Sequence, residues 1–140
     1  SEVGSGLSAR RVREGDEVCL IGVGRMLEFA EQAAEKLAAE GHSVTVWDPR
    51  VVKPLDPEML ADAARHALVV TVEDGVREGG AGSAIREALS ALRPSGLPVV
   101  VLGTPDRYLL HGQPDQILVE LGLDADGIAS STLAALASAV

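Results

Sequence analysis

Apolar runs alternate with helical periods along almost the whole chain, and this alternation constrains the fold more than any other feature. Residues 17–23 form a nearly continuous apolar run, which is the pattern of a strand covered on both faces. Residues 25–40 carry an apolar stripe at helical spacing, and Gly41 ends it. Because strands and helices keep alternating and their connections are too long for hairpins, we expect a largely parallel sheet.

The rest of the chain continues the same pattern. Further strands are expected at residues 43–47, 68–73 and 98–103, and helices at 56–66, 82–93, 114–121 and from Asp124 onward. Asp56 and Asp124 are the expected N-caps of two of these helices. The predicted fold is therefore α/β, a three-layer sandwich with a mostly parallel sheet of four or five strands and helices on both faces. Residues 1–14 are interpreted as a linker or the edge of an expressed fragment, and residues 15–140 as one domain.

Composition excludes several classes of function. The formal net charge is −9, so a nucleic-acid backbone would be repelled, and we expect no nucleic-acid partner. No run of about 18 apolar residues exists, so we expect no membrane span. The single Cys19 lies inside an apolar run, which favours a small buried side chain in a reducing cytoplasm. Arginine outnumbers lysine ten to two, which hints at a GC-rich bacterial genome.

A glycine turn after the first apolar run, Gly22-Val23-Gly24, invites a dinucleotide-binding interpretation. The third glycine of that fingerprint should fall at position 27, where the chain has Leu27. A leucine there would hold the helix off the strand and crowd a pyrophosphate. The segment is better interpreted as a tight strand-to-helix turn, in which Arg25 either faces a phosphate or is solvated.

A second glycine segment precedes the helix expected at 82–93. Backbone amides that converge at a helix N-terminus favour a negative partner, but the lysine of a nucleotide P-loop is missing. Two interpretations stay open, a weak anion site and a glycine hinge that permits close approach by another domain or subunit. The anion or interface candidates of the whole chain are Arg25, Gly79, Gly80, Gly82, Ser83, Arg107, Tyr108 and His111.

No catalytic, cofactor-binding or metal-binding residue is predicted. The three histidines have no metal-ligand spacing, and the lone cysteine has no evident base.

Several strings, taken in order, resemble the C-terminal (third) domain of the 1-deoxy-D-xylulose-5-phosphate synthase family, which belongs to the transketolase-like, thiamine-diphosphate-dependent enzymes. They are Arg13-Glu14-Gly15-Asp16, Asp48-Pro49-Arg50, Lys53-Pro54-Leu55-Asp56, Gly79-Gly80-Ala81-Gly82-Ser83, Gly103-Thr104-Pro105-Asp106-Arg107-Tyr108, His111-Gly112 and the run from Glu120 to Ile128. The similarity spans nearly the whole chain. Val51 and Gly75 depart from the family pattern.

The resemblance implies a transferase parent that joins pyruvate and glyceraldehyde 3-phosphate to give 1-deoxy-D-xylulose 5-phosphate and CO2, for isoprenoid and thiamine biosynthesis. It implies that thiamine diphosphate and magnesium are held by the first two domains, whose Gly-Asp-Gly and asparagine motif is missing from this asparagine-free chain. The expected role is therefore structural: an inactive isolated domain that packs on the first two domains and supports a cytoplasmic, bacterial homodimer. Family precedent also suggests one antiparallel strand in the sheet.

Two alternatives stay open. The chain is also compatible with the C-terminal domain of a 2-oxo-acid dehydrogenase decarboxylase beta chain or of a transketolase. A different class of function would be a free-standing phosphate- or nucleotide-binding module built on the two glycine turns.

Overall fold

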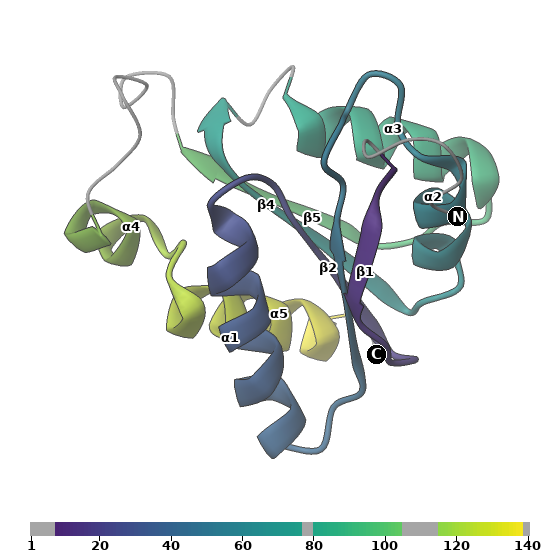
Figure 1. Ribbon diagram of the computed structural model, residues 1–140. Coiled ribbons are helices and arrows are strands. Elements are labelled where there is room, and N and C mark those ends of the chain that lie inside the picture. Colours follow the sequence, from purple (N-terminus) through teal and green to yellow (C-terminus); the bar gives the residue numbers. More distant parts are fainter. Residues whose placement is uncertain (1–7, 77–79, 105–114, 139–140) are drawn as a thin grey trace.

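The computed structural model describes residues 8–76, 80–104 and 115–138, which fold into a five-stranded sheet with helices on both faces (Figure 1). The strands are β1 (Arg10–Arg13), β2 (Val18–Gly22), β3 (Val44–Asp48), β4 (Leu68–Val76) and β5 (Val99–Thr104). The helices are α1 (Met26–Ala39), α2 (Pro57–Ala64), α3 (Ala81–Leu92), α4 (Asp115–Leu121) and α5 (Ala125–Ser138). The predicted fold class is confirmed.

The strand order is β1-β3-β2-β4-β5, in which β2, β3, β4 and β5 are parallel and β1 is antiparallel to β3. The single antiparallel strand that family precedent suggested is therefore present. All five residues of β2 are buried, as its continuous apolar sequence predicts for a central strand with covered faces.

Alternate residues of each strand supply two separate apolar cores. Leu20, Val46 and Val70 point to the face covered by α1 and α5, where Leu37 and Ile128 complete the cluster. The residues between them point to the opposite face, which α2 and α3 cover; they include Cys19, Ile21, Trp47 and Val69, packed with Met59, Ala63, Ile85 and Leu89. Two cores on one sheet make the three-layer sandwich that the alternation predicts.

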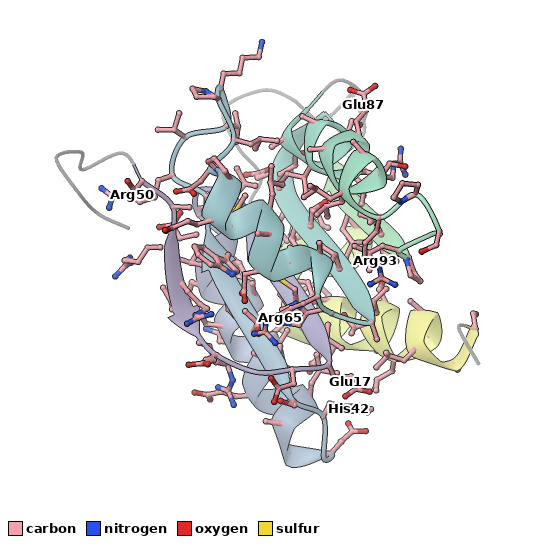
Figure 2. All side chains as sticks on the ribbon, turned by 90° about the vertical axis from the view of Figure 1, so that its right-hand side faces the viewer. Glu17, His42, Arg50, Arg65, Glu87 and Arg93 are labelled. Carbon is pink, nitrogen blue, oxygen red and sulfur yellow. The ribbon has the colours of Figure 1, made fainter. Side chains whose placement is uncertain are left out.

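Several predicted helix ends are confirmed by their hydrogen bonds. Asp56 is the N-cap of α2, and its Oδ1 accepts from the backbone N–H of Glu58 at 2.8 Å. Asp124 precedes α5, and its Oδ1 accepts from the N–H of Gly127 at 3.0 Å. Directly after α3, Arg93, which Figure 2 labels, donates from Nη1 to the carbonyl of His66 at 2.8 Å.

The interpretation of residues 1–14 as a linker needs correction where the structure describes them, because Arg10–Arg13 forms the edge strand β1. Its sequence Arg-Arg-Val-Arg has no apolar alternation, so the pattern gave no strand signal. Pairing with β3, together with side-chain contacts to α2, supplies the order that local sequence does not. Among the described residues, no helix is long and apolar enough to cross a membrane.

Candidate contact surface at the carboxyl edge of the sheet

The four parallel strands end at one edge of the sheet, where open α/β folds make their contacts. This carboxyl edge carries the turn after β2, the segment after Asp48, the end of β4 with the start of α3, and the end of β5. Of the predicted candidates, the structure describes Arg25, Gly80, Gly82 and Ser83 at this edge or in the first turn of α3. Gly79, Arg107, Tyr108 and His111 lie outside the described residues.

The amides at the N-terminus of α3 already have an anionic partner within the chain. Glu73, on β4, is buried, and its two carboxylate oxygens accept from the N–H groups of Ala81 at 3.2 Å and Gly82 at 2.9 Å. The N-cap residue Gly80 has no side chain to do this. The negative partner that the glycine segment predicted is thus the carboxylate of Glu73, placed where the helix dipole favours it.

Gly82 lets α3 approach its own sheet. A Cβ at this position would lie 2.6 Å from Thr71 Oγ1 on β4 and 2.6 Å from Val101 Cγ1 on β5, well inside van der Waals contact. The hydroxyl of Thr71 is buried and finds no hydrogen-bond partner in the described part of the chain. The close approach for which this glycine is needed is therefore between α3 and its neighbouring strands.

Arg25 is paired across the edge. Its Nε lies 2.9 Å from Asp74 Oδ2, which joins the turn after β2 to the end of β4. Strands β2 and β4 are neighbours, and the helices that follow them lie on opposite faces of the sheet (Figure 1). The ion pair therefore sits at the topological switch point, the crevice in which such sheets usually bind ligands.

The expectation that Leu27 would hold α1 away from the sheet is wrong. A Cβ on Gly22 would fall 2.7 Å from the Cα of Leu27 and 3.1 Å from the Cβ of Ala30. The close contact of strand and helix is made at Gly22, so the backbone at Leu27 comes near without a third glycine. The segment is a tight strand-to-helix turn, as the sequence favoured.

After β3, the chain turns within a few residues. Arg50 has φ 62°, in the left-handed region, and its N–H donates to Asp48 Oδ1 at 3.1 Å. The peptide bond between Lys53 and Pro54 is cis. Asp56 then ends the turn by capping α2, so the segment has a sufficient structural account.

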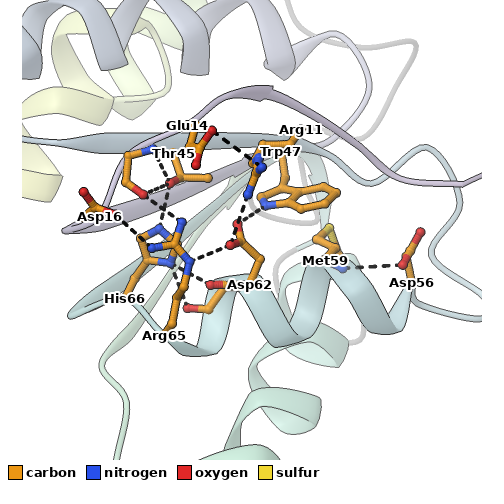
Figure 3. A network of polar contacts seen from close by, with 12 residues as sticks. Arg11, Glu14, Asp16, Thr45, Trp47, Asp56, Met59, Asp62, Arg65 and His66 are labelled. Atoms are coloured by element: carbon orange, nitrogen blue, oxygen red, sulfur yellow. Dashed lines mark hydrogen bonds and ion pairs between the residues drawn. The ribbon is translucent and has the colours of Figure 1, made fainter. Parts of the chain in front are cut away.

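A polar network lies between β1, β3 and α2, and it centres on Asp62 (Figure 3). Asp62 accepts from Trp47 Nε1 at 2.7 Å and from Arg65 Nε at 2.6 Å, and it pairs with Arg11 at 3.3 Å. Burial alone would raise the pKa of Asp62, but the hydrogen bonds from Trp47 and Arg65 and the nearby guanidinium charges outweigh it, so the pKa is lowered.

Sequence reasoning missed this network, because it joins residues 11, 47 and 62, which are far apart in the chain. His66 belongs to it: its ring is buried, with Nδ1 2.8 Å from the carbonyl of Asp62 and Nε2 2.7 Å from Thr45 Oγ1. The sequence placed His66 at the end of the helix expected over residues 56–66 and gave no sign that the ring is enclosed.

No three His, Cys, Asp or Glu side chains gather into a possible metal site within residues 8–76, 80–104 and 115–138. Cys19 is buried, and burial, followed by the charge of Asp62, raises the pKa of its thiol far above the ordinary value. In the described part of the carboxyl edge, the amides that open α3 are bound to Glu73, and Arg25 is paired with Asp74.

The chain is similar in sequence to a known domain family and to named proteins. The family model "Transketolase, C-terminal domain" matches residues 7–128. Proteins named 1-deoxy-D-xylulose-5-phosphate synthase are similar to the chain: that of Anaeromyxobacter sp. (strain K) is 45% identical over 133 residues, which cover 93% of this chain and 21% of that protein. That of Nitrosospira multiformis is 50% identical over 117 residues, covering 83% of this chain and 18% of that protein.

A solved structure described as "Split gene transketolase, inactive beta4 tetramer" superposes with a TM-score of 0.81 at 34% identity. The match covers 92% of this chain and 42% of that one. The chain spans about a fifth of the length of the synthase relatives that it matches.

Proposed function

The chain belongs to the transketolase C-terminal domain family, and from that premise we propose that it is the C-terminal domain of a 1-deoxy-D-xylulose-5-phosphate synthase with a structural role. The proposal depends on one observation: the chain is 45% identical, over 133 residues, to a region that makes up 21% of the synthase of Anaeromyxobacter sp. (strain K). The parent would join pyruvate and glyceraldehyde 3-phosphate with loss of CO2, while this domain braces the parts that do the chemistry.

The parent family uses thiamine diphosphate, and the described residues of this chain do not fit that cofactor. A diphosphate needs free N–H donors and a metal ion, but the amides that open α3 are bound to Glu73, and no metal-ligand cluster is present in the described ranges. We infer that the preceding domains hold the cofactor and its magnesium. We propose no catalytic role for the residues that the structure describes.

The carboxyl edge supports a packing role for this domain. Glu73 and Asp74 are each engaged with a donor of the same chain, so the switch-point crevice offers no uncommitted charge from these residues. A surface of that kind suits contact with the first two domains of the parent. The relative described as a beta4 tetramer supports self-association, and we propose a homodimer for the parent, in a bacterial cytoplasm.

The other interpretations are less favoured. A decarboxylase beta chain or a transketolase proper would retain the fold, but the curated relatives quoted above carry the synthase name at 45% and 50% identity. A free-standing phosphate-binding module would need open amides at α3 and an open Arg25, and both groups have partners within the chain.

A complementation assay tests the proposal. The synthase of Anaeromyxobacter sp. (strain K), shortened so that the fifth matched by this chain is removed, is assayed with pyruvate and glyceraldehyde 3-phosphate, alone and with this chain added. We expect no turnover and no thiamine diphosphate binding by this chain alone, and a gain in turnover when both parts are mixed. Appreciable turnover by this chain alone would refute the proposal, as would a shortened synthase that works fully without it.

A further inference from the structure

Residues 9–16, called here the N-terminal strap, contribute little to either apolar core. The strap comprises β1 and the turn that leads toward β2. Only Ala9 and Val12 pack against the two core clusters, and both do so while partly exposed. Its pairing with β3 also changes register between Arg11 and Arg13. Hydrophobic burial and a regular ladder therefore account for only part of what holds the strap in place.

Side chains of α2 and its N-cap contact the strap at three levels. Asp56 Oδ2 accepts from the N–H of Ala9 at 2.9 Å, at the start of the helix. Asp62 Oδ1 pairs with Arg11 Nη1 at 3.3 Å, in the middle. Directly after the helix, Arg65 Nη2 donates to the carbonyl of Gly15 at 2.8 Å, and its Nη1 pairs with the carboxylate of Asp16 at 3.2 Å. The strap thus follows α2 along its whole length (Figure 3).

The middle contact joins Arg11 to Asp62, which also accepts from Trp47 and Arg65, so Arg11→Gln removes this contact and leaves those two hydrogen bonds in place. The side chain of Asp62 is 13% exposed, so its charge is far less screened than that of a surface pair. Arg11 reaches it while its guanidinium lies 5.9 Å from the ring centroid of Trp47, which itself donates to Asp62. Asp62 therefore ties together β1, β3 and α2, and it orients Arg65 for the contacts at the end of the strap.

A mostly buried carboxylate that accepts from three donors holds its neighbours strongly in place, since charge-assisted hydrogen bonds are about twice as strong as neutral ones. The turn at the end of the strap is also held by the side chains of Thr45 and Ser43, which accept from the N–H groups of Gly15 and Asp16. We propose that the β1 part of the strap is a separable unit held against α2 through Asp62, and that Asp62 thereby fixes the direction in which the preceding part of the parent chain meets this domain. The second half of this statement depends on the proposed function, because it supposes a preceding part. In this role Asp62 is a positioning residue.

Hydrogen exchange on this chain tests whether the strap is separable. In Asp62→Asn, we expect the amides of Arg10–Arg13 to exchange about tenfold faster, as for the loss of one charge-assisted hydrogen bond. Amides of the central strands, such as those of Leu20 and Val70, should change less than about twofold. Asp126→Asn is the matched control, since it removes another carboxylate, 2.9 Å from Lys36, that does not touch the strap.

A distance measurement tests the positioning role. Spin labels at Ser8→Cys and at Glu35→Cys on α1 would report how the chain approaches the domain, because the thiol of Cys19 is buried and would stay unlabelled. We expect a narrow distance distribution in this chain when it carries only the two labelling substitutions, and a broad one once Asp62→Asn is added. Arg11→Gln removes the contact from the strap side and should broaden the distribution without disturbing α2.

Three results would overturn the proposal. The first is equal acceleration of exchange in β1, β2 and β4, which would mean that Asp62 supports the whole fold. The second is unchanged exchange in β1, and the third is an unchanged distance distribution in both variants. None of these readouts depends on turnover, so their failure is distinguishable from failure of the complementation assay.

Discussion

Replacing Gly82 by alanine separates packing within the domain from the anion-site interpretation of the same segment. In an exposed helix the change would add up to about 1 kcal/mol of stability, because glycine is a poor helix former. At this position the new Cβ would lie 2.6 Å from both Thr71 Oγ1 and Val101 Cγ1, and 3.3 Å from Glu73 Oε1. Overpacking of this kind costs about 1–3 kcal/mol. We therefore expect a net loss of about 1–2 kcal/mol.

Thermal unfolding followed by circular dichroism measures this loss. For a domain of this size, 1–2 kcal/mol corresponds to a fall in Tm of about 3–8 °C. A double-mutant cycle with Thr71→Ala identifies the cause, since removing Oγ1 takes away one of the two clashing atoms and should restore part of the stability. A Tm that is unchanged or raised in Gly82→Ala would refute the packing argument, and so would a cycle with no coupling.

Three further predictions follow from single contacts. Glu73→Gln should lose about 1 kcal/mol in urea unfolding, because a charged acceptor at the N-terminus of α3 becomes neutral, whereas Glu87→Gln on the exposed side of α3 should change little. The pKa of Asp62 is lowered from its ordinary value of 3.8, so the unfolded state binds more protons and this contribution to stability is present above that value. This contribution should be lost as pH falls through the lower folded-state pKa. In a series of urea unfolding measurements at different pH, Asp62→Asn should therefore lose less of its free energy of unfolding over this acidic range than the unchanged chain does. An equally steep fall in the variant would contradict the assignment of this pH dependence to Asp62. Burial raises the pKa of the Cys19 thiol, so a thiol reagent at pH 8 should label it only after denaturant is added, and rapid labelling of the folded chain would show that the strand is open.

The sequence predicted the parts of the fold whose signals are local. β2 is a continuous apolar run buried on both faces, and Asp56 caps α2 by bonds to residues two and three positions away. β1 escaped prediction for the opposite reason. Its four residues include three arginines, and what orders them is a strand and a helix more than thirty residues further along the chain.

The sequence predicted where the candidate site lies, but only the structure shows which groups contact one another there. The sequence left an anion site and a hinge open for the glycine segment, and in the structure the amides there bind Glu73, which lies on the preceding strand eight residues before Ala81. One signal was available: Gly80 at the N-cap position has no side chain to cap α3, so the cap had to come from elsewhere. Arg25 was likewise singled out without its partner Asp74, because residues 49 positions apart meet only once the strand order is known.

The contacts at the carboxyl edge bear on the proposed packing role of a fold that commonly binds ligands there. In an open α/β sheet, the N-terminus of a helix and the crevice at the switch point are the two places where fixed positive potential collects. Here Glu73 satisfies the amides at the first place, and Asp74 pairs with Arg25 at the second. Both carboxylates come from the end of β4, so one stretch of strand supplies the partner at both places. Groups that already have partners can be covered without leaving a bare charge, but burying the Arg25–Asp74 pair would still cost desolvation free energy.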